Sequence, residues 1–168
     1  FKIASELEKF NNERKLIENL MLKKIEKKTL SNFKDPVIIL SGNNWHSGII
    51  GIIASRIKEK YNKPTIIISF DNGLGKASAR SVIGFDIGSA IISAVQNNIL
   101  KKGGGHKMAG GFTIEEDKIV EFRNFINKRF LMNKSPKKIN TLFFDMKISP
   151  SALNENFFLE INFLSPFG

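Results

Sequence analysis

The glycine-rich basic stretch between Lys101 and Phe112 has the residue types best suited to chemistry with anions. Five of the chain's 13 glycines and one of its two histidines lie in it, together with three lysines. Glycines let the backbone approach a ligand closely, and bare amides beside Lys and His make a concavity that binds phosphate. Glycine pairs are also ordinary turn punctuation. The stretch therefore predicts either an anion-binding loop or a tight turn between a helix and a strand.

A second candidate for phosphate binding is the alternating segment Gly75–Ser81. If it is a strand, its period of two puts Lys76, Ser78 and Arg80 on one face and only small residues on the other. A guanidinium group matches two phosphate oxygens, and a neighbouring hydroxyl can complete the clamp. The alternative is a solvent-facing edge strand with ordinary basic side chains.

Residues that could make these 168 residues a self-sufficient enzyme are scarce. There is no cysteine, and few acidic residues lie near either histidine, His46 or His106. This inventory excludes disulfides, thiolate catalysis and cysteine-ligated zinc, and no Asp or His spacing suits a metal. Neither Gly42–Gly48 nor Gly103–Gly111 has the order of a nucleotide-binding fingerprint. We predict no catalytic residue, no metal and no bound cofactor here, and binding of an anionic polymer rather than its turnover.

The charge of the chain points the same way. A net charge of +10 and a pI of about 9.8 favour a polyanionic partner. The alternative is a coding bias, because Lys, Ile and Asn are abundant while Ala is scarce. The hydrophobic fraction of 42% is enough for a core. No apolar run approaches the roughly 18 residues of a membrane helix, so we expect a cytoplasmic protein without a membrane partner.

The elements that must position these residues begin with a long helix. Apolar residues at helical spacing predict one helix over about residues 1–31. Two β-branched runs, 36–42 and 65–69, flank a predicted helix over 49–61, for which Ser47 is a candidate N-cap. Strand, helix and strand together have the size of a βαβ unit, which predicts an α/β fold.

The second half of the chain continues this alternation. A turn signal at 71–73 precedes the Lys76 strand, and Asp86 is expected to cap a helix that runs to about residue 95. After the glycine loop, the pattern predicts a short strand over 112–114 and a helix over 115–131.

The C-terminal part differs in composition. A basic run without acids predicts a linker, with a boundary near residues 133–138. Residues 140–148 alternate like a strand, and Ser149 followed by Pro150 is expected to open a short helix.

Three motifs occur in an order and at a spacing that resemble a known family. They are Trp45-His-Ser-Gly-Ile-Ile-Gly-Ile-Ile-Ala-Ser-Arg56, Gly75-Lys-Ala-Ser-Ala-Arg-Ser81 and Gly104-Gly-His-Lys-Met-Ala-Gly-Gly111. Together they resemble the DHHA1 domain of the RecJ family, bacterial exonucleases specific for single-stranded DNA, over about residues 35–129. The first motif favours this family over oligoribonuclease-type DHHA1 phosphodiesterases and over the C-terminal region of alanyl-tRNA synthetase.

The resemblance implies an α/β, DHHA1-type domain at 34–133, with a mixed, largely parallel sheet flanked by helices. Residues 1–33 resemble the connector helix from a DHH catalytic domain, and residues 134–168 resemble a linker and the start of a truncated OB-fold. The chain is therefore expected to be a fragment whose partners include DHH and OB-fold domains of the same polypeptide. The family's Mn²⁺ or Mg²⁺ belongs to the DHH domain.

The resemblance also implies roles for particular residues. Ser78 and Arg80 fall where the family binds the 5′-terminal phosphate, and His106 would face the catalytic cleft, where it could assist. The complete expected set of nucleic-acid-binding residues is Ser78, Arg80, Lys76, Gly104, Gly105, His106, Lys107, Trp45 and His46. One departure is that the family motif closes Ala-Ala-Gly where this chain has Ala109-Gly110-Gly111, a change that loosens the backbone.

Three functions follow as hypotheses. The first is the substrate-binding part of a 5′→3′ single-stranded-DNA exonuclease of DNA repair and recombination, inactive without its DHH domain. The second is a non-catalytic nucleic-acid-binding module. The third is a DHH-type phosphodiesterase that acts on short oligonucleotides or cyclic dinucleotides.

Overall fold

The computed structural model describes residues 2–28, 34–133 and 144–165. The chain forms two compact units, Phe1–Lys137 and Lys138–Gly168. Within the described residues, no helix combines the length and the apolar character needed to cross a membrane.

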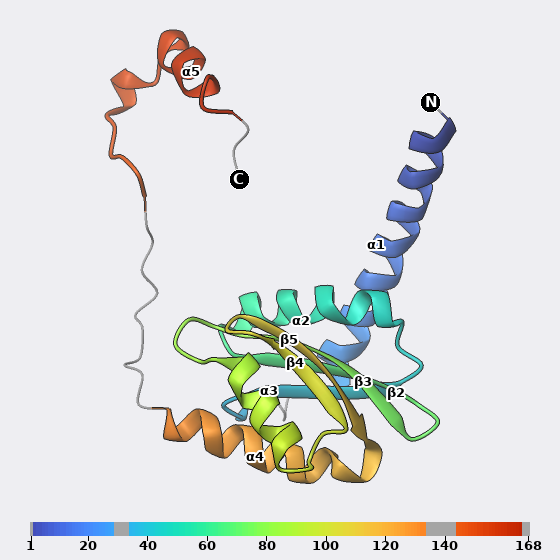
Figure 1. Ribbon diagram of the computed structural model, residues 1–168. Coiled ribbons are helices and arrows are strands. Elements are labelled where there is room, and N and C mark those ends of the chain that lie inside the picture. The colour runs from blue at the N-terminus through green and yellow to red at the C-terminus, as the bar shows by residue number, and fades with distance from the viewer. Residues whose placement is uncertain (1, 29–33, 134–143, 166–168) are drawn as a thin grey trace. The chain divides into compact units, whose positions relative to one another are not determined.

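The first unit is built on a five-stranded sheet in the order β1-β2-β3-β5-β4 (Figure 1). β1 and β2 run parallel, and the other three strand pairings are antiparallel. The strands are β1 (Ile38–Asn43), β2 (Thr65–Asp71), β3 (Leu74–Arg80), β4 (Lys102–His106) and β5 (Ala109–Glu115).

The predicted α/β fold with a mixed sheet is confirmed, but the expectation of largely parallel strands is wrong. Only the βαβ unit of β1, α2 (Ser47–Tyr61) and β2 pairs in parallel. β2 and β3 instead form a hairpin, whose turn residues Asn72 and Gly73 have φ angles of 48° and 74°. An Asn-Gly pair at positive φ suits a tight hairpin turn, and such a turn makes the following strand antiparallel.

The two faces of the sheet are covered differently. On one face, α3 (Ile87–Gln96) and α4 (Ile119–Met132) bury a core that draws on β1, β2, β3 and β5. On the other face, α2 and the end of α1 (Lys2–Lys28) pack on β1 and β2, whose Ile38, Leu40 and Ile67 join that smaller core. Figure 1 shows α2 on one side of the sheet and α3 and α4 on the other.

The predicted long N-terminal helix is confirmed as α1, although little of its apolar stripe is buried. Met21 and Ile25 lie in the core, whereas Ile3, Leu7 and Phe10 are 74%, 63% and 62% exposed. The helix is therefore anchored near its C-terminal end.

The helices on the opposite face agree with the sequence. Asp86 caps α3, accepting a hydrogen bond from the Ser89 N–H at 2.9 Å. A short 3₁₀ turn, Glu116–Lys118, leads into α4, whose Phe122 and Ile126 are fully buried.

The stretch expected to be a glycine loop is a β-hairpin. Lys102–His106 forms edge strand β4, and β5 already begins at Ala109, before the short strand predicted at 112–114. All five residues of β4 pair with β5: Lys102 with Thr113, Gly103 with Phe112, Gly104 with Gly111, Gly105 with Gly110 and His106 with Ala109. Pairing with β5 overrides the weak strand propensity of glycine.

The second unit is described over residues 144–165. Ser149 precedes a 3₁₀ helix over Pro150–Ala152, as predicted, and α5 (Glu155–Asn162) follows. The strand predicted over 140–148 lies partly outside the described residues, and residues 144–148 are not in a strand. The start of an OB-fold stays a prediction.

Candidate functional site

Strand register brings most of the predicted binding residues onto one face of the sheet. Lys76, Ser78 and Arg80 alternate along β3 with the buried Ala77 and Ala79, as predicted. Because paired residues of antiparallel strands share a face, the register aligns these side chains with residues of β5 and β4. We call this half of the sheet the open face: its three rows are Arg80–Ala109–His106, Ser78–Gly111–Gly104 and Lys76–Thr113–Lys102.

Arg80 and Ser78 form a preorganised pair at the border between the open face and α2. Arg80 Nη1 donates to Ser78 Oγ at 3.1 Å and to the Ala79 carbonyl at 2.9 Å. A Cβ at Gly51 of α2 would lie 3.1 Å from Arg80 Nη2 and 3.2 Å from Ser78 Oγ. Any larger residue at position 51 would therefore press on the pair. Held this way, the guanidinium has remaining donors for a phosphate.

The N-terminus of α2 lies beside this pair, since Gly51 is in its second turn. The predicted cap Ser47 is wrong: His46 is the N-cap, and its Nδ1 accepts from the Gly48 N–H at 3.2 Å. Imidazole can supply this acceptor in place of a hydroxyl, and the Nε2 of the neutral ring then carries the proton. The exposed His46 thus offers a donor next to the positive end of a helix dipole, which favours anions.

Trp45 serves the local fold. Its ring packs against the smaller core, and a Cβ at Gly42 would collide with it. Its carbonyl accepts a 2.6 Å hydrogen bond from Ser69 Oγ, which ties the β1–α2 loop to β2. These contacts position His46, and a direct contact of Trp45 with nucleic acid stays a prediction.

The five glycines of the β4–β5 hairpin divide between the two faces. A Cβ at Gly103 would lie 2.8 Å from Ile91 Cγ2 of α3, and one at Gly110 would lie 2.5 Å from Ile91 Cδ1. Gly105 has no room either, because the β5 backbone at Ala109 and Gly110 fills the space. These three glycines allow α3 to pack closely on the hairpin and allow β4 and β5 to lie close to each other.

Gly104 and Gly111 face the other way. A Cβ at Gly104 would meet no heavy atom within 4 Å, and one at Gly111 would meet only the Ala77 carbonyl oxygen at 3.4 Å. They make a bare floor between the basic side chains of the open face.

Lys107 and His106 occupy the hairpin end of this face. His106 and Lys107 are both exposed, and the Lys107 carbonyl accepts from the Ile87 N–H at 3.2 Å. The hydrogen bond from the Ser89 backbone lowers the pKa of Asp86, and the charge of Lys107 lowers it further. The turn is thereby joined to the start of α3.

Lys102, Thr113 and Gly111 belong to the open face, although the sequence did not single them out. Their shared face follows from the pairing of β4 with β5, which a glycine-rich stretch that predicts a loop does not indicate. The described residues contain no group of three or more His, Cys, Asp or Glu side chains that could hold a metal ion. The chemistry available on the open face is therefore recognition of an anion by Arg, Lys, His and bare backbone.

Comparison with known proteins shows the family to which this chain belongs. The model of the DHHA1 domain matches residues 34–132. The single-stranded-DNA-specific exonuclease RecJ of Haemophilus influenzae is 36% identical over 134 residues, which are 75% of this chain and 23% of the relative. RecJ of Bacillus subtilis is 27% identical over 172 residues, covering 99% of this chain and 21% of the relative.

A solved structure agrees with these sequence matches. The crystal structure of RecJ from Thermus thermophilus in complex with Mn²⁺ has a TM-score of 0.81 and 28% identity, and the match covers 99% of this chain and 24% of that one. This chain thus spans roughly a fifth to a quarter of the relatives it matches. The resemblance drawn from three motifs is confirmed: the chain belongs to the DHHA1 domain family, and within it is similar to the RecJ exonucleases.

Proposed function

We propose that this chain is the substrate-binding part of a 5′→3′ exonuclease that degrades single-stranded DNA in repair and recombination. The observation that carries the proposal is the Arg80–Ser78 pair of β3. Arg80 Nη1 and Ser78 Oγ are joined by a 3.1 Å hydrogen bond, and both side chains lie beside Gly51 of α2. In this role the pair binds the 5′-terminal phosphate. The similarity to RecJ proteins, whose name gives single-stranded DNA as the substrate, supports that ligand.

The remaining residues of the predicted site have supporting roles. His46 donates from the end of α2, and Lys76, His106 and Lys107 supply positive charge around the strand. Gly104 and Gly105 keep bulk away from its backbone. His106 acts as a substrate contact, and no residue of this chain is assigned to bond cleavage.

Hydrolysis itself is assigned to a DHH domain of the same polypeptide. Related RecJ proteins have been crystallised with Mn²⁺ or Mg²⁺, but the described residues here do not offer a ligand set that fits such an ion. We therefore assign the metal chemistry to that DHH domain, as the similarity to RecJ suggests, and expect this part alone to be inactive.

Binding of matched single strands with and without a 5′ phosphate tests the proposal. The 5′-phosphorylated strand should bind more tightly, and Arg80→Ala should remove about tenfold of that preference, as expected for a charged hydrogen bond. Arg129→Ala is the matched control, because Arg129 also bonds a serine, Ser93, at 3.1 Å but lies on α4. The control should leave the preference intact.

Two results would redirect the assignment. Equal weakening of both strands in Arg80→Ala and Arg129→Ala, with a steep dependence on salt, would indicate a plain basic nucleic-acid-binding module. Affinity that stops rising beyond two nucleotides would favour the phosphodiesterase on short oligonucleotides or cyclic dinucleotides.

A further inference from the structure

A second cationic row lies on the open face beyond the Arg80–Ser78 pair. The register places Lys76 of β3 opposite Thr113 of β5, and Thr113 opposite Lys102 of β4. We call these three residues the lysine row. Two strand spacings of about 4.8 Å separate the two lysine backbones, and Thr113 between them is only 9% exposed. Their flexible four-carbon stems allow both ammonium groups to converge on one anion.

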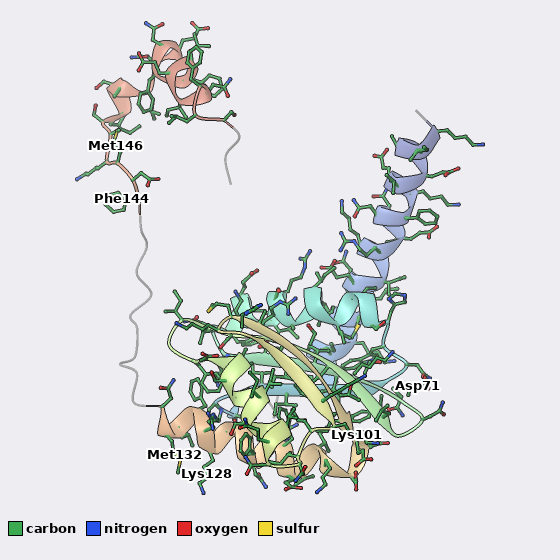
Figure 2. All side chains as sticks on the ribbon, in the orientation of Figure 1. Asp71, Lys101, Lys128, Met132, Phe144 and Met146 are labelled. Atoms are coloured by element: carbon green, nitrogen blue, oxygen red, sulfur yellow. The ribbon has the colours of Figure 1, made fainter. Side chains whose placement is uncertain are left out.

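The two lysines have no acidic partner among the described residues. Both are exposed, and neither takes part in the ion pairs formed there. Glu115, two residues along β5 from Thr113, is bound instead by Lys101, whose Nζ lies 2.8 Å from its Oε1. Figure 2 shows Lys101 at the same end of the sheet as Asp71. The lysine row thus presents uncompensated positive charge that a bound anion would neutralise.

The floor next to the lysine row is not explained by packing. A methyl group at Gly104 would meet no atom within 4 Å, and Gly111 has ordinary space for one. Their row lies one side-chain step from the lysine row, two residues along each strand, which is about 6.6 Å. Backbone without side chains lets a flat or bulky ligand group lie directly against the sheet.

We propose that Lys76 and Lys102 bind an internal phosphodiester of a single strand, with the intervening nucleotide over Gly104 and Gly111. The position of the first phosphate, at Ser78 and Arg80, rests on the proposed function. The strand then runs along the sheet from the Arg80 and His106 end toward the turn between β2 and β3. Lys102 becomes a nucleic-acid-binding residue, and Lys76 contacts an inner phosphate rather than the terminal one.

The test compares a ligand that has only the first phosphate with one that reaches the lysine row. The whole chain is titrated at low salt, by NMR, with thymidine 5′-monophosphate and with 5′-phosphorylated hexathymidylate. Lys102→Ala and Lys76→Ala should each weaken hexathymidylate binding about twofold to fivefold, the range of an exposed ion pair. Binding of the monophosphate should be unchanged. In the double variant, the slope of log affinity against log salt should fall by about 0.7, the value for one phosphate of a single strand.

Lys101→Ala is the matched control, since it removes the same charge from the adjacent residue but from a lysine already paired with Glu115. It should leave hexathymidylate binding unchanged. The inference is overturned if the control weakens binding as much as Lys102→Ala, if both ligands weaken equally, or if hexathymidylate does not bind at all.

The outcomes also separate this inference from the proposed function. Loss of the 5′-phosphate preference in Arg80→Ala, with no effect of Lys102→Ala, would contradict only the proposed role of the lysine row. A length-dependent effect of Lys102→Ala, with the preference retained in Arg80→Ala, would contradict the terminal phosphate site and support the lysine row as a contact to the nucleic-acid backbone.

Discussion

The glycines of the β4–β5 hairpin differ residue by residue in what surrounds them, and this makes their substitution predictable. Gly103→Ala should destabilise the protein by about 1–3 kcal/mol, as overpacking does, because the new methyl group would meet Phe112 Cβ at 2.6 Å. Gly104→Ala should leave stability unchanged or raise it by up to about 1 kcal/mol, since the unfolded chain loses freedom and space is available. Urea unfolding of both variants measures the difference.

The substitutions Gly103→Ala and Gly104→Ala also separate an effect on folding from an effect on binding. Gly104→Ala should weaken binding of a single strand although the protein folds normally, because the methyl group occupies the floor of the open face. Equal destabilisation by the two substitutions would contradict the division of the glycines between faces.

Gly110 stands where the family motif has alanine, and its neighbour explains how the chain accommodates the difference. A Cβ at position 110 would lie 2.5 Å from Ile91 Cδ1 and 2.9 Å from the Gly104 carbonyl oxygen, so the Ile91 side chain occupies part of the space of the missing methyl group. Gly110→Ala should therefore destabilise by about 1–3 kcal/mol. Adding Ile91→Val, which deletes Cδ1, should recover part of that loss.

A double-mutant cycle from urea unfolding checks this compensation. Ile91→Val alone should destabilise by about 0.5–1.5 kcal/mol, because Ile91 is fully buried. Additive effects of the two substitutions would rule out a direct exchange of space between positions 110 and 91.

At the scale of an element, the start of α3 contributes a pH-dependent part of stability. The hydrogen bond from the Ser89 N–H lowers the pKa of Asp86 below its ordinary 3.8. A lowered folded pKa means that this contribution is fully present above about pH 4, near the unfolded value, and is lost as pH falls through the folded pKa. Asp86→Ala should cost about 1 kcal/mol at pH 7, the usual value of an N-cap.

Unfolding midpoints measured between pH 7 and pH 3 test the cap. Asp86→Asn is the control, because asparagine caps without titrating in this range. The stability of the native protein relative to this control should fall only at the acidic end. A difference that is constant over the whole range would mean that Asp86 is not the titrating cap.

The elements also show which parts of the site the sequence could predict. The face of Lys76, Ser78 and Arg80 depends on a period of two within seven residues, so local pattern was sufficient. β4 has no such signal, because glycines carry no side chain that could reveal alternation. Its strand form depends on pairing with β5 and on close packing against Gly88 of α3, which are contacts between distant parts of the chain.

The prediction of the N-cap of α2 was wrong for a related reason. A hydroxyl at Ser47 is the usual cap, but the helix begins at Ser47, two residues before its predicted start, and the imidazole of His46 accepts the bond. Likewise the apolar stripe of α1 predicted the helix, but it could not indicate which part of the helix is buried against the rest of the unit.

At the scale of the first compact unit, one buried carboxylate ties α1 to the rest. Glu18 is 1% exposed; it accepts from Arg14 at 3.0 Å and is paired with Arg56 of α2. Glu18→Gln removes the charge and keeps the shape. We expect a loss of about 1.5–3 kcal/mol, the value of a hydrogen bond to a charged group, and faster amide exchange over residues 18–25.

Glu13→Gln is the matched control, since Glu13 is exposed on the same helix. Its effect on urea unfolding and on amide exchange should be negligible, as for an ordinary surface charge. Unchanged exchange in Glu18→Gln would show that Met21 and Ile25 hold α1 without help from the ion pairs.

This anchoring has a mechanical consequence. Sixteen residues of α1 precede Glu18, and at 1.5 Å per residue they form an arm of about 24 Å. A rotation of only about 5° at the anchor would move the far end of such an arm by roughly 2 Å. A small rearrangement between Arg14, Glu18 and Arg56 would thus be magnified along α1, between α2 and whatever the far end of α1 contacts.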